Sequence, residues 1–287
     1  MARDPLVVGV DVAARRPCVA VALRGGRTLE AVSWIDADES LAGDRERLFE
    51  WLQDLAPVAV GVDAPQRPRR ARGAAAERPR SCDAQLAGRR IPTYQVPTRA
   101  AAQRAAGRYA WMETGWAHFR ELGRRGFEPP VPGGLPGALG QAPAALEVYP
   151  HAAFTTLLGG APPPKSTRAG LRVRVATLRA AGVVWDEYFD HDSLDALVAA
   201  LTAWRFVQGR AAPLGDERDG FDWLPVPEHG LLSASGRLTE RAALAAADLQ
   251  RAGEIVLRFR VRPGHQAGVA HFHQPLLELV VEDQRLG

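Results

Sequence analysis

Two apolar segments of this 287-residue chain each end in an aspartate, and this repeated pattern constrains the fold more than any other feature. Residues 6–11 read LVVGVD and end at Asp11, while residues 58–63 read VAVGVD and end at Asp63. A short continuous apolar run is typical of a strand buried on both faces, as in the parallel part of an α/β sheet. A single acid could simply close a buried strand, but a third apolar segment, residues 144–150, also carries an acid, Glu147. The pattern therefore predicts three acids delivered to one sheet edge.

The remaining elements are predicted around these segments. Apolar runs at 18–23 and 28–35, with a glycine-containing turn between them, predict that the chain opens with an antiparallel meander of three strands. Asp44 can cap a helix that runs to about Leu55, ahead of Pro57. Further helices are predicted over residues 111–122, 151–158 and 167–181, and residues 128–143 form a loop rich in proline and glycine.

A fourth acidic segment, residues 190–204 (DHDSLDALVAALTAW), predicts a helix whose apolar residues recur at helical spacing and face the core. Asp192 and Asp195 share another face of this helix, three residues apart. Because acids at a helix N-terminus often act as caps, one of these two is expected to be only a cap, which leaves the other available for a site. His191 could shuttle a proton there, although a histidine beside a helix start is more often a surface or capping residue.

Positive charge is concentrated between Arg67 and Arg125. That interval holds fourteen arginines and four acids, whereas the whole chain has a net charge of only +3, so the remainder is acidic. Clustered arginines bind phosphates and release counterions, which favours nucleic acid as the partner of this interval; the alternative is a solvated arginine-rich surface. The candidate nucleic-acid-binding residues are Arg67, Arg69, Arg70, Arg72, Arg89 and Arg90.

Composition predicts a substantial core, since 46% of the residues are hydrophobic and 24% are charged. No segment approaches the length of a membrane helix and the N-terminus has no apolar signal core, so we expect a cytoplasmic protein without a membrane partner. Cys18 and Cys82 are far apart and lack CxxC spacing, which predicts two reduced thiols.

Six short motifs, in the order of these elements, resemble one known family. They are GVDVA at 9–13, GVDAP at 61–65, RSCD at 80–83, RRIPTY at 89–94, EVYPHAAF at 147–154 and HDSLDALVAALTAW at 191–204. Together they resemble the DUF429 family of predicted nucleases with a ribonuclease H-like fold, from about residue 6 to residue 227. The D-x-x-D start of the last motif is also similar to the helix that ends the catalytic core of RuvC-type Holliday-junction resolvases.

The resemblance implies an α/β protein with a ribonuclease H-like, mixed five-stranded sheet flanked by helices. We expect this domain to span residues 1–227, with a basic helical and loop insert at about 66–143. Residues 228–287 lie outside the resemblance and predict a small C-terminal extension, made of a helix at 239–251 and two strands at 255–261 and 272–282. This extension could be a substrate arm, a contact in a homodimer or a cover for a sheet edge.

The resemblance also implies a metal-dependent nuclease that hydrolyses phosphodiester bonds in DNA or RNA. Converging carboxylates can hold two divalent ions about 3.5–4 Å apart, and Mg²⁺ or Mn²⁺ suits such oxygen ligands. In this assignment Asp11 bridges both ions, while Asp63 and Glu147 each complete one coordination sphere. Asp195 binds the ion nearer the attacking water, and Asp192 assists or replaces it. These acids should therefore share one cleft.

Other chemistries fit the sequence less well. The chain has no Walker loop, no GxGxxG and no GxSxG motif. The ATPase branch of the fold needs glycine-rich phosphate loops after its first and fourth strands, and residues 12–16 and 64–66 contain no glycine. His271 and His273 share a strand face but have no evident third ligand. Two alternatives remain: a non-catalytic nucleic-acid-binding protein of the same fold, and a hydrolase of a small phosphorylated substrate.

Overall fold

A computed structural model describes eight stretches of the chain, residues 4–35, 41–70, 78–105, 107–133, 142–185, 189–226, 256–262 and 276–282. The chain divides into two compact units. The first unit comprises residues 1–153 and 183–226, and it contains all of the acids singled out above. The second unit comprises residues 154–182 and 227–287.

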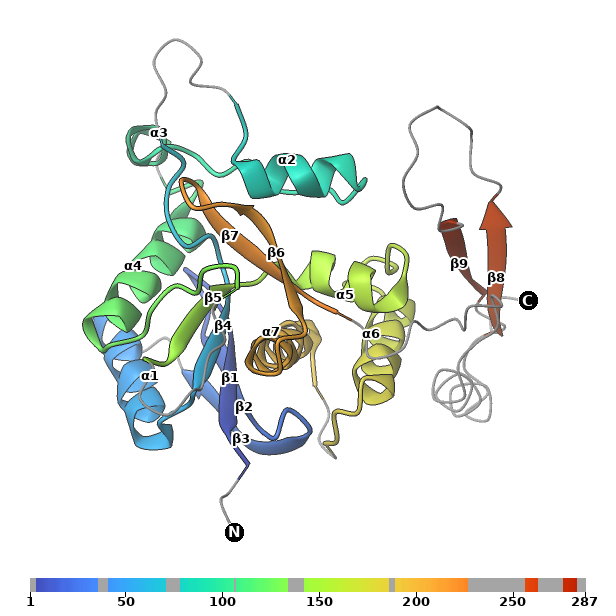
Figure 1. Ribbon diagram of the computed structural model, residues 1–287, viewed down its shortest axis with the longest axis horizontal. Coiled ribbons are helices and arrows are strands. Elements are labelled where there is room, and N and C mark those ends of the chain that lie inside the picture. The colour runs from blue at the N-terminus through green and yellow to red at the C-terminus, as the bar shows by residue number, and fades with distance from the viewer. Residues whose placement is uncertain are drawn as a thin grey trace. The chain divides into compact units, whose positions relative to one another are not determined.

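The first unit is an α/β structure built on a seven-stranded mixed sheet in the order β3-β2-β1-β4-β5-β7-β6 (Figure 1). Its strands are β1 (Leu6–Asp11), β2 (Cys18–Arg24), β3 (Thr28–Ile35), β4 (Ala59–Asp63), β5 (Ala144–Glu147), β6 (Ala211–Asp216) and β7 (Gly220–Pro225). The antiparallel meander of β1, β2 and β3 is confirmed, and β1, β4 and β5 run parallel to one another. The prediction of five strands is wrong, because β6 and β7 extend the sheet beyond β5.

The two additional strands form a hairpin that the sequence pattern does not predict. The segment of β6, AAPLGD, is made mostly of residue types that are depleted in strands, and Pro213 fits there because β6 lies at the sheet edge. The turn signal is the Asp219–Gly220 pair: Gly220 has a φ of 93°, and the Asp219 N–H donates to Asp216 Oδ1 at 2.8 Å.

Helices cover both faces of the sheet in the first unit (Figure 1). The helices of the whole chain are α1 (Leu41–Leu55), α2 (Ser81–Gly88), α3 (Arg99–Arg104), α4 (Ala110–Arg124), α5 (Pro150–Leu158), α6 (Arg168–Ala180) and α7 (His191–Val207). The short helices α2 and α3 were not predicted, and the others match the predicted helices to within a few residues. The buried helix α7 packs on β1, β2 and β4.

The alternation of side chains along β1 separates the two faces of the sheet. Val8 and Val10 belong to an apolar cluster that also contains Leu48 of α1 and Phe119 of α4. Gly9 has the opposite orientation and faces α7. Asp11 is two residues farther along the strand, so it lies on the face that α7 covers.

Glycine at two paired positions allows α7 to approach the sheet closely. Gly9 of β1 and Gly61 of β4 are register partners. A Cβ atom on Gly9 would lie 2.0 Å from the backbone oxygen of Ala196, and one on Gly61 would lie 2.4 Å from the backbone oxygen of Ala199. The backbone of α7 therefore sits directly on these strands, which brings the start of the helix to the strand ends.

We expect Gly9→Ala to destabilise the protein by at least about 3 kcal/mol, the upper end of what an overpacked methyl group costs, because the helix backbone must move. Gly123→Ala is a matched control, since a Cβ there meets no atom within 4 Å and alanine favours the helix by about 0.5–1 kcal/mol. Chemical denaturation measures both changes. Equal stability of Gly9→Ala and the wild type would contradict the close approach of α7.

The second unit contains α6 and the antiparallel pair β8 (Val256–Arg262) and β9 (Leu276–Glu282). The two strands predicted near the C-terminus are therefore confirmed. Thr167 caps α6 by accepting the N–H of Gly170 at 3.0 Å. The predicted helix at 239–251, His271 and His273 lie outside the described residues. The role of this extension, including a homodimer contact, stays a prediction.

Two smaller predictions can be compared with the structure. Cys18 and Cys82 are free thiols, as predicted, and burial raises the pKa of Cys82. Among the helices that the structure describes, none has both the length and the apolar character needed to cross a membrane.

Candidate metal centre

Three buried carboxylates meet where β1 ends and α7 begins. Asp11 is the last residue of β1, and Asp192 and Asp195 lie in the first turns of α7. Each offers one carboxylate oxygen, and these three oxygens lie within 4.8 Å of one another. All three side chains are buried. Such a group of oxygen donors is the kind of site that hard divalent cations prefer. The structure thus brings together the strand acid and both predicted helix acids.

Neither helix acid of this group acts as the N-cap of α7. That position is Asp190, whose Oδ1 accepts the backbone N–H of Ser193 at 2.9 Å and its hydroxyl at 2.8 Å. Burial opposes ionisation of Asp190, but these hydrogen bonds outweigh it and lower the pKa. The prediction that Asp192 or Asp195 is only a cap is therefore wrong, because the preceding aspartate satisfies the helix end.

Arg16 is a cation that contacts this acidic group. Its Nη2 lies 3.2 Å from Asp11 Oδ2, and its Nη1 contacts Asp192 Oδ2. The Arg16 side chain is 46% exposed, so the positive charge approaches the buried acids from the solvent side. On the other side of Asp192, His191 Nδ1 lies 2.5 Å from Oδ1. Sequence reasoning gave Arg16 no role, although it lies only five residues after Asp11.

Asp63 lies beside the three-carboxylate group. It is the register partner of Asp11 on the neighbouring parallel strand, and such strands are about 4.8 Å apart. Paired residues on parallel strands project to the same face, so Asp63 also projects from the face that α7 covers. Its side chain is partly exposed, whereas that of Asp11 is buried.

Glu147 does not share this face. Its register partner is Val62, which belongs to the apolar cluster on the side of α1 and α4. Glu147 Oε2 accepts the backbone N–H of Gln66 at 2.6 Å, and both of its carboxylate oxygens accept hydrogen bonds from Arg80. Strand alternation thus turns Glu147 away from Asp11 and existing donors occupy it, while Glu147 and Asp63 line one hollow; that Glu147 shares a cleft with the three-carboxylate group stays a prediction.

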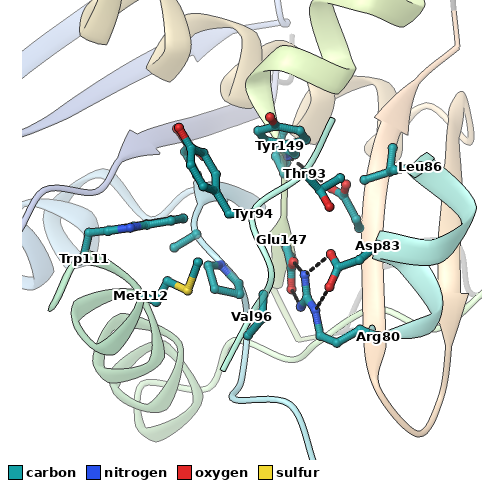
Figure 2. A pocket seen from close by; sticks show the side chains of 15 residues that line it. Arg80, Asp83, Leu86, Thr93, Tyr94, Val96, Trp111, Met112, Glu147 and Tyr149 are labelled. Carbon is teal, nitrogen blue, oxygen red and sulfur yellow. Dashed lines mark hydrogen bonds and ion pairs between the residues drawn. The ribbon is translucent and has the colours of Figure 1, made fainter. Parts of the chain in front are cut away.

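Arg80 holds two buried acids together, as Figure 2 shows. It donates to Glu147 from Nη1 at 3.0 Å and from Nη2 at 2.7 Å. It also donates to Asp83 from Nε at 3.0 Å and from Nη2 at 2.9 Å. Two edges of the planar guanidinium are used, one for each carboxylate, which only arginine can do. Arg80 and Asp83 are the ends of the RSCD motif, so the sequence marked them without revealing their partner.

Asp222 is a further buried acid that sequence reasoning missed with the β6–β7 hairpin. It is the register partner of Glu147, and its Oδ1 accepts the backbone N–H of Tyr149 at 3.1 Å. Burial, and next the nearby charge of Glu147, raise the pKa of Asp222 well above its usual range. Folding therefore favours the protonated, neutral form of this side chain.

We expect Asp222→Asn to stabilise the protein at neutral pH. An aspartate with a raised pKa stabilises the folded state fully only below its unfolded pKa of about 3.9, and that stability is lost as pH rises toward the folded value, by about 1.4 kcal/mol per pH unit. Asparagine keeps an oxygen that can accept the Tyr149 N–H, and it cannot ionise. The melting temperature of the variant should exceed that of the wild type at pH 7 and match it near pH 4. A gain that was independent of pH, or one equalled by Glu217→Gln on the exposed turn of the same hairpin, would contradict this assignment.

A family model described as "protein of unknown function (DUF429)" matches residues 9–219, nearly three quarters of the chain. The chain belongs to the DUF429 family. No curated protein and no solved structure matches it significantly. In this DUF429 protein the matched region includes Asp11, Asp63, Glu147, Asp192 and Asp195.

The predicted basic residues of the DUF429 chain differ in their surroundings. Arg67 donates to the backbone oxygen of Glu217 at 3.1 Å, and Arg69 donates to the backbone oxygens of Val96 and Arg78 at 3.3 and 3.0 Å. These two arginines therefore hold the local fold. Three others, Arg70, Arg89 and Arg90, are exposed to solvent, and Arg72 lies outside the described residues.

Proposed function

We propose that this DUF429 protein is a divalent-metal-dependent nuclease that hydrolyses phosphodiester bonds. The observation that carries the proposal is the buried group of Asp11, Asp192 and Asp195, whose ligating oxygens lie within 4.8 Å of one another. Three buried acids at this spacing repel one another, and the half-exposed Arg16 offsets only part of that repulsion. A metal centre gives that arrangement a purpose.

The arrangement of the elements supports a ribonuclease H-like classification. A three-stranded antiparallel meander leads into the parallel strands β4 and β5, and a late helix crosses β1 and β4 with its acids at the strand ends. This is the order expected from the resemblance to ribonuclease H-like nucleases. The D-x-x-D spacing of Asp192 and Asp195 adds the likeness to RuvC-type resolvases.

The donor set fits Mg²⁺ or Mn²⁺, since it offers only carboxylate oxygens. Asp11, Asp192 and Asp195 would hold one ion, and Asp63, beside Asp11, would contribute to a second. The metal would supply charge stabilisation for the phosphodiester and a more acidic water. Glu147 is reassigned from a metal ligand to a positioning residue. Its bond to the Gln66 N–H, fixed by Arg80, anchors the segment that follows Asp63.

Nucleic acid is favoured as the substrate by the exposed arginines Arg70, Arg89 and Arg90. Labelled single- and double-stranded DNA and RNA should be cleaved with Mn²⁺ or Mg²⁺ and left intact in EDTA. Asp54→Asn, which alters an exposed acid on α1, is the control and should keep full activity. Tight Mn²⁺ binding without cleavage of any nucleic acid would instead support a small phosphorylated substrate or a non-catalytic role. A wild-type protein that neither binds Mn²⁺ nor cleaves nucleic acid would contradict the proposal.

Arg16 and the metal should compete for the same carboxylates. We expect Arg16→Gln to raise the affinity for Mn²⁺ by roughly 2- to 5-fold, because a half-exposed ion pair is worth about 0.5–1 kcal/mol. Isothermal titration calorimetry measures the change, and Arg15→Gln, an exposed neighbour, is the control. A lower affinity in Arg16→Gln would show that Arg16 supports the metal site and does not compete with it.

A further inference from the structure

A shallow hollow, open to solvent, lies next to the acidic sheet edge in the first unit. Asp63 contributes to its wall, as do the aromatic residues Tyr94, Trp111 and Tyr149. Figure 2 shows Tyr94 and Trp111 on one side of the hollow and Arg80 with Asp83 on the other. Because Asp63 is the register partner of Asp11, the hollow begins one strand away from the three-carboxylate group.

Tyr94 is an exposed aromatic residue in the wall of this hollow. Its side chain is 67% exposed, although the segment around it is fixed. The hydroxyl of Tyr149 donates to the backbone oxygen of Pro92 at 2.9 Å, two residues before Tyr94. The Tyr94 ring contacts Trp111 edge to face, with centroids 5.8 Å apart and an interplanar angle of 73°. The ring is thus held in place while much of its surface remains free to stack on another planar group.

The acids at the bottom of the hollow already have partners within the protein. Arg80 binds both Asp83 and Glu147, and Glu147 also accepts the Gln66 N–H. Asp222 favours its neutral form because burial raises its pKa. The acids of the floor are therefore held by donors of the protein and do not face a ligand as bare carboxylates. The chain leading to Tyr94 is basic, since the exposed Arg89 and Arg90 precede it by five and four residues.

We propose that this hollow binds an unpaired base of single-stranded nucleic acid, stacked on Tyr94, beside the strand-end acids. This inference deepens the proposed nuclease function and rests on it. A planar, uncharged base suits an aromatic wall above acids that are already hydrogen-bonded, and its phosphates suit the exposed arginines. A base in a duplex is already stacked on both faces and cannot enter. Strands that are single or locally unpaired are therefore the preferred substrate class.

The test compares two oligomers with the same number of phosphates. A fluorescent twelve-residue oligothymidylate and a twelve-residue abasic oligomer are titrated with the wild-type protein in EDTA, which prevents cleavage, and anisotropy reports binding. Stacking of one base predicts that the oligothymidylate binds about 5- to 150-fold more tightly. Raising the salt concentration should weaken both oligomers and leave their ratio unchanged, because only the phosphate contacts release counterions.

Variants assign the base preference to the hollow. Tyr94→Ala should remove most of the preference and leave the abasic affinity unchanged, whereas Tyr94→Phe, which keeps the ring, should retain it. Val131→Ala removes another exposed apolar side chain and is the control. Melting temperatures should stay close to wild type, since Tyr94 is largely exposed. Equal affinity for the two oligomers, or a preference that survives Tyr94→Ala, would overturn the proposal.

Failure of the proposed base site can be distinguished from failure of the proposed nuclease function. A base preference that depends on Tyr94, together with no metal-dependent cleavage, supports the hollow as a base site and rejects the nuclease. Metal-dependent cleavage without a base preference rejects the base site and leaves the nuclease proposal intact. Tighter binding of a duplex than of the single strand would also overturn the base site.

Discussion

Asp11→Asn is expected to lower metal-dependent cleavage and Mn²⁺ affinity by more than about 100-fold, since even residues that only orient metal ligands are worth about 10- to 100-fold. Asparagine keeps the shape of the side chain and removes the charge shared with Asp192 and Asp195. Cleavage rates and calorimetric titration with Mn²⁺ measure the two effects. Asp54→Asn should match the wild type in both assays.

The melting temperature of Asp11→Asn shows whether the variant loses function because it misfolds or because it lacks the carboxylate. Removing one of three crowded carboxylates relieves repulsion in the metal-free protein, so its melting temperature should stay the same or rise. The contact with Arg16 that is lost is of little weight, because Arg16 is half exposed and can be hydrated. An active Asp11→Asn variant would rule out Asp11 as a metal ligand.

Arg80→Met should have the largest effect on stability, a loss of about 3–5 kcal/mol, because it leaves two buried carboxylates without their cation. Arg80 is itself only 4% exposed, so water cannot replace it without local unfolding. Chemical denaturation at neutral pH measures the loss. Arg80→Lys should be intermediate, since lysine keeps the charge but cannot bond both Asp83 and Glu147 in the same fork geometry.

Arg89→Met is the matched control for Arg80→Met. Arg89 is exposed at the end of the same helix, α2, and its substitution should change stability by less than about 0.5 kcal/mol. Similar losses for the two variants would show that the buried cluster around Arg80 contributes nothing specific. The double variant Arg80→Met with Glu147→Gln should recover part of the loss, because it removes one of the uncompensated charges.

The strands that carry Asp11, Asp63 and Glu147 were predictable, because buried parallel strands are written as continuous apolar runs. Their shared sheet edge followed from the parallel arrangement. The face of each acid did not follow, since it depends on the register between strands. One residue of offset, Glu147 opposite Val62 and not opposite Asp63, turns Glu147 to the other side of the sheet.

The sequence also did not reveal which residues contact the buried acids. Arg16 and Arg80 lie among thirty-five arginines, and nothing local distinguishes one that reaches a buried carboxylate from one that is solvated. Their contacts join residues that are far apart in the chain, such as Arg16 with Asp192 and Arg80 with Glu147. The β6–β7 hairpin was missed for a different reason. Its alanine, proline and glycine residues carry no strand periodicity, and pairing with β5 stabilises it.

The most direct test of the metal centre is a crystal of the wild-type protein soaked in millimolar Mn²⁺ and measured for anomalous scattering. We expect an anomalous peak bound by carboxylate oxygens of Asp11, Asp192 and Asp195, with the Arg16 guanidinium displaced from them. Glu147 should remain paired with Arg80 and take no part in coordination. No peak among these three aspartates, with Arg16 still in contact with Asp11 and Asp192, would contradict the proposed metal centre.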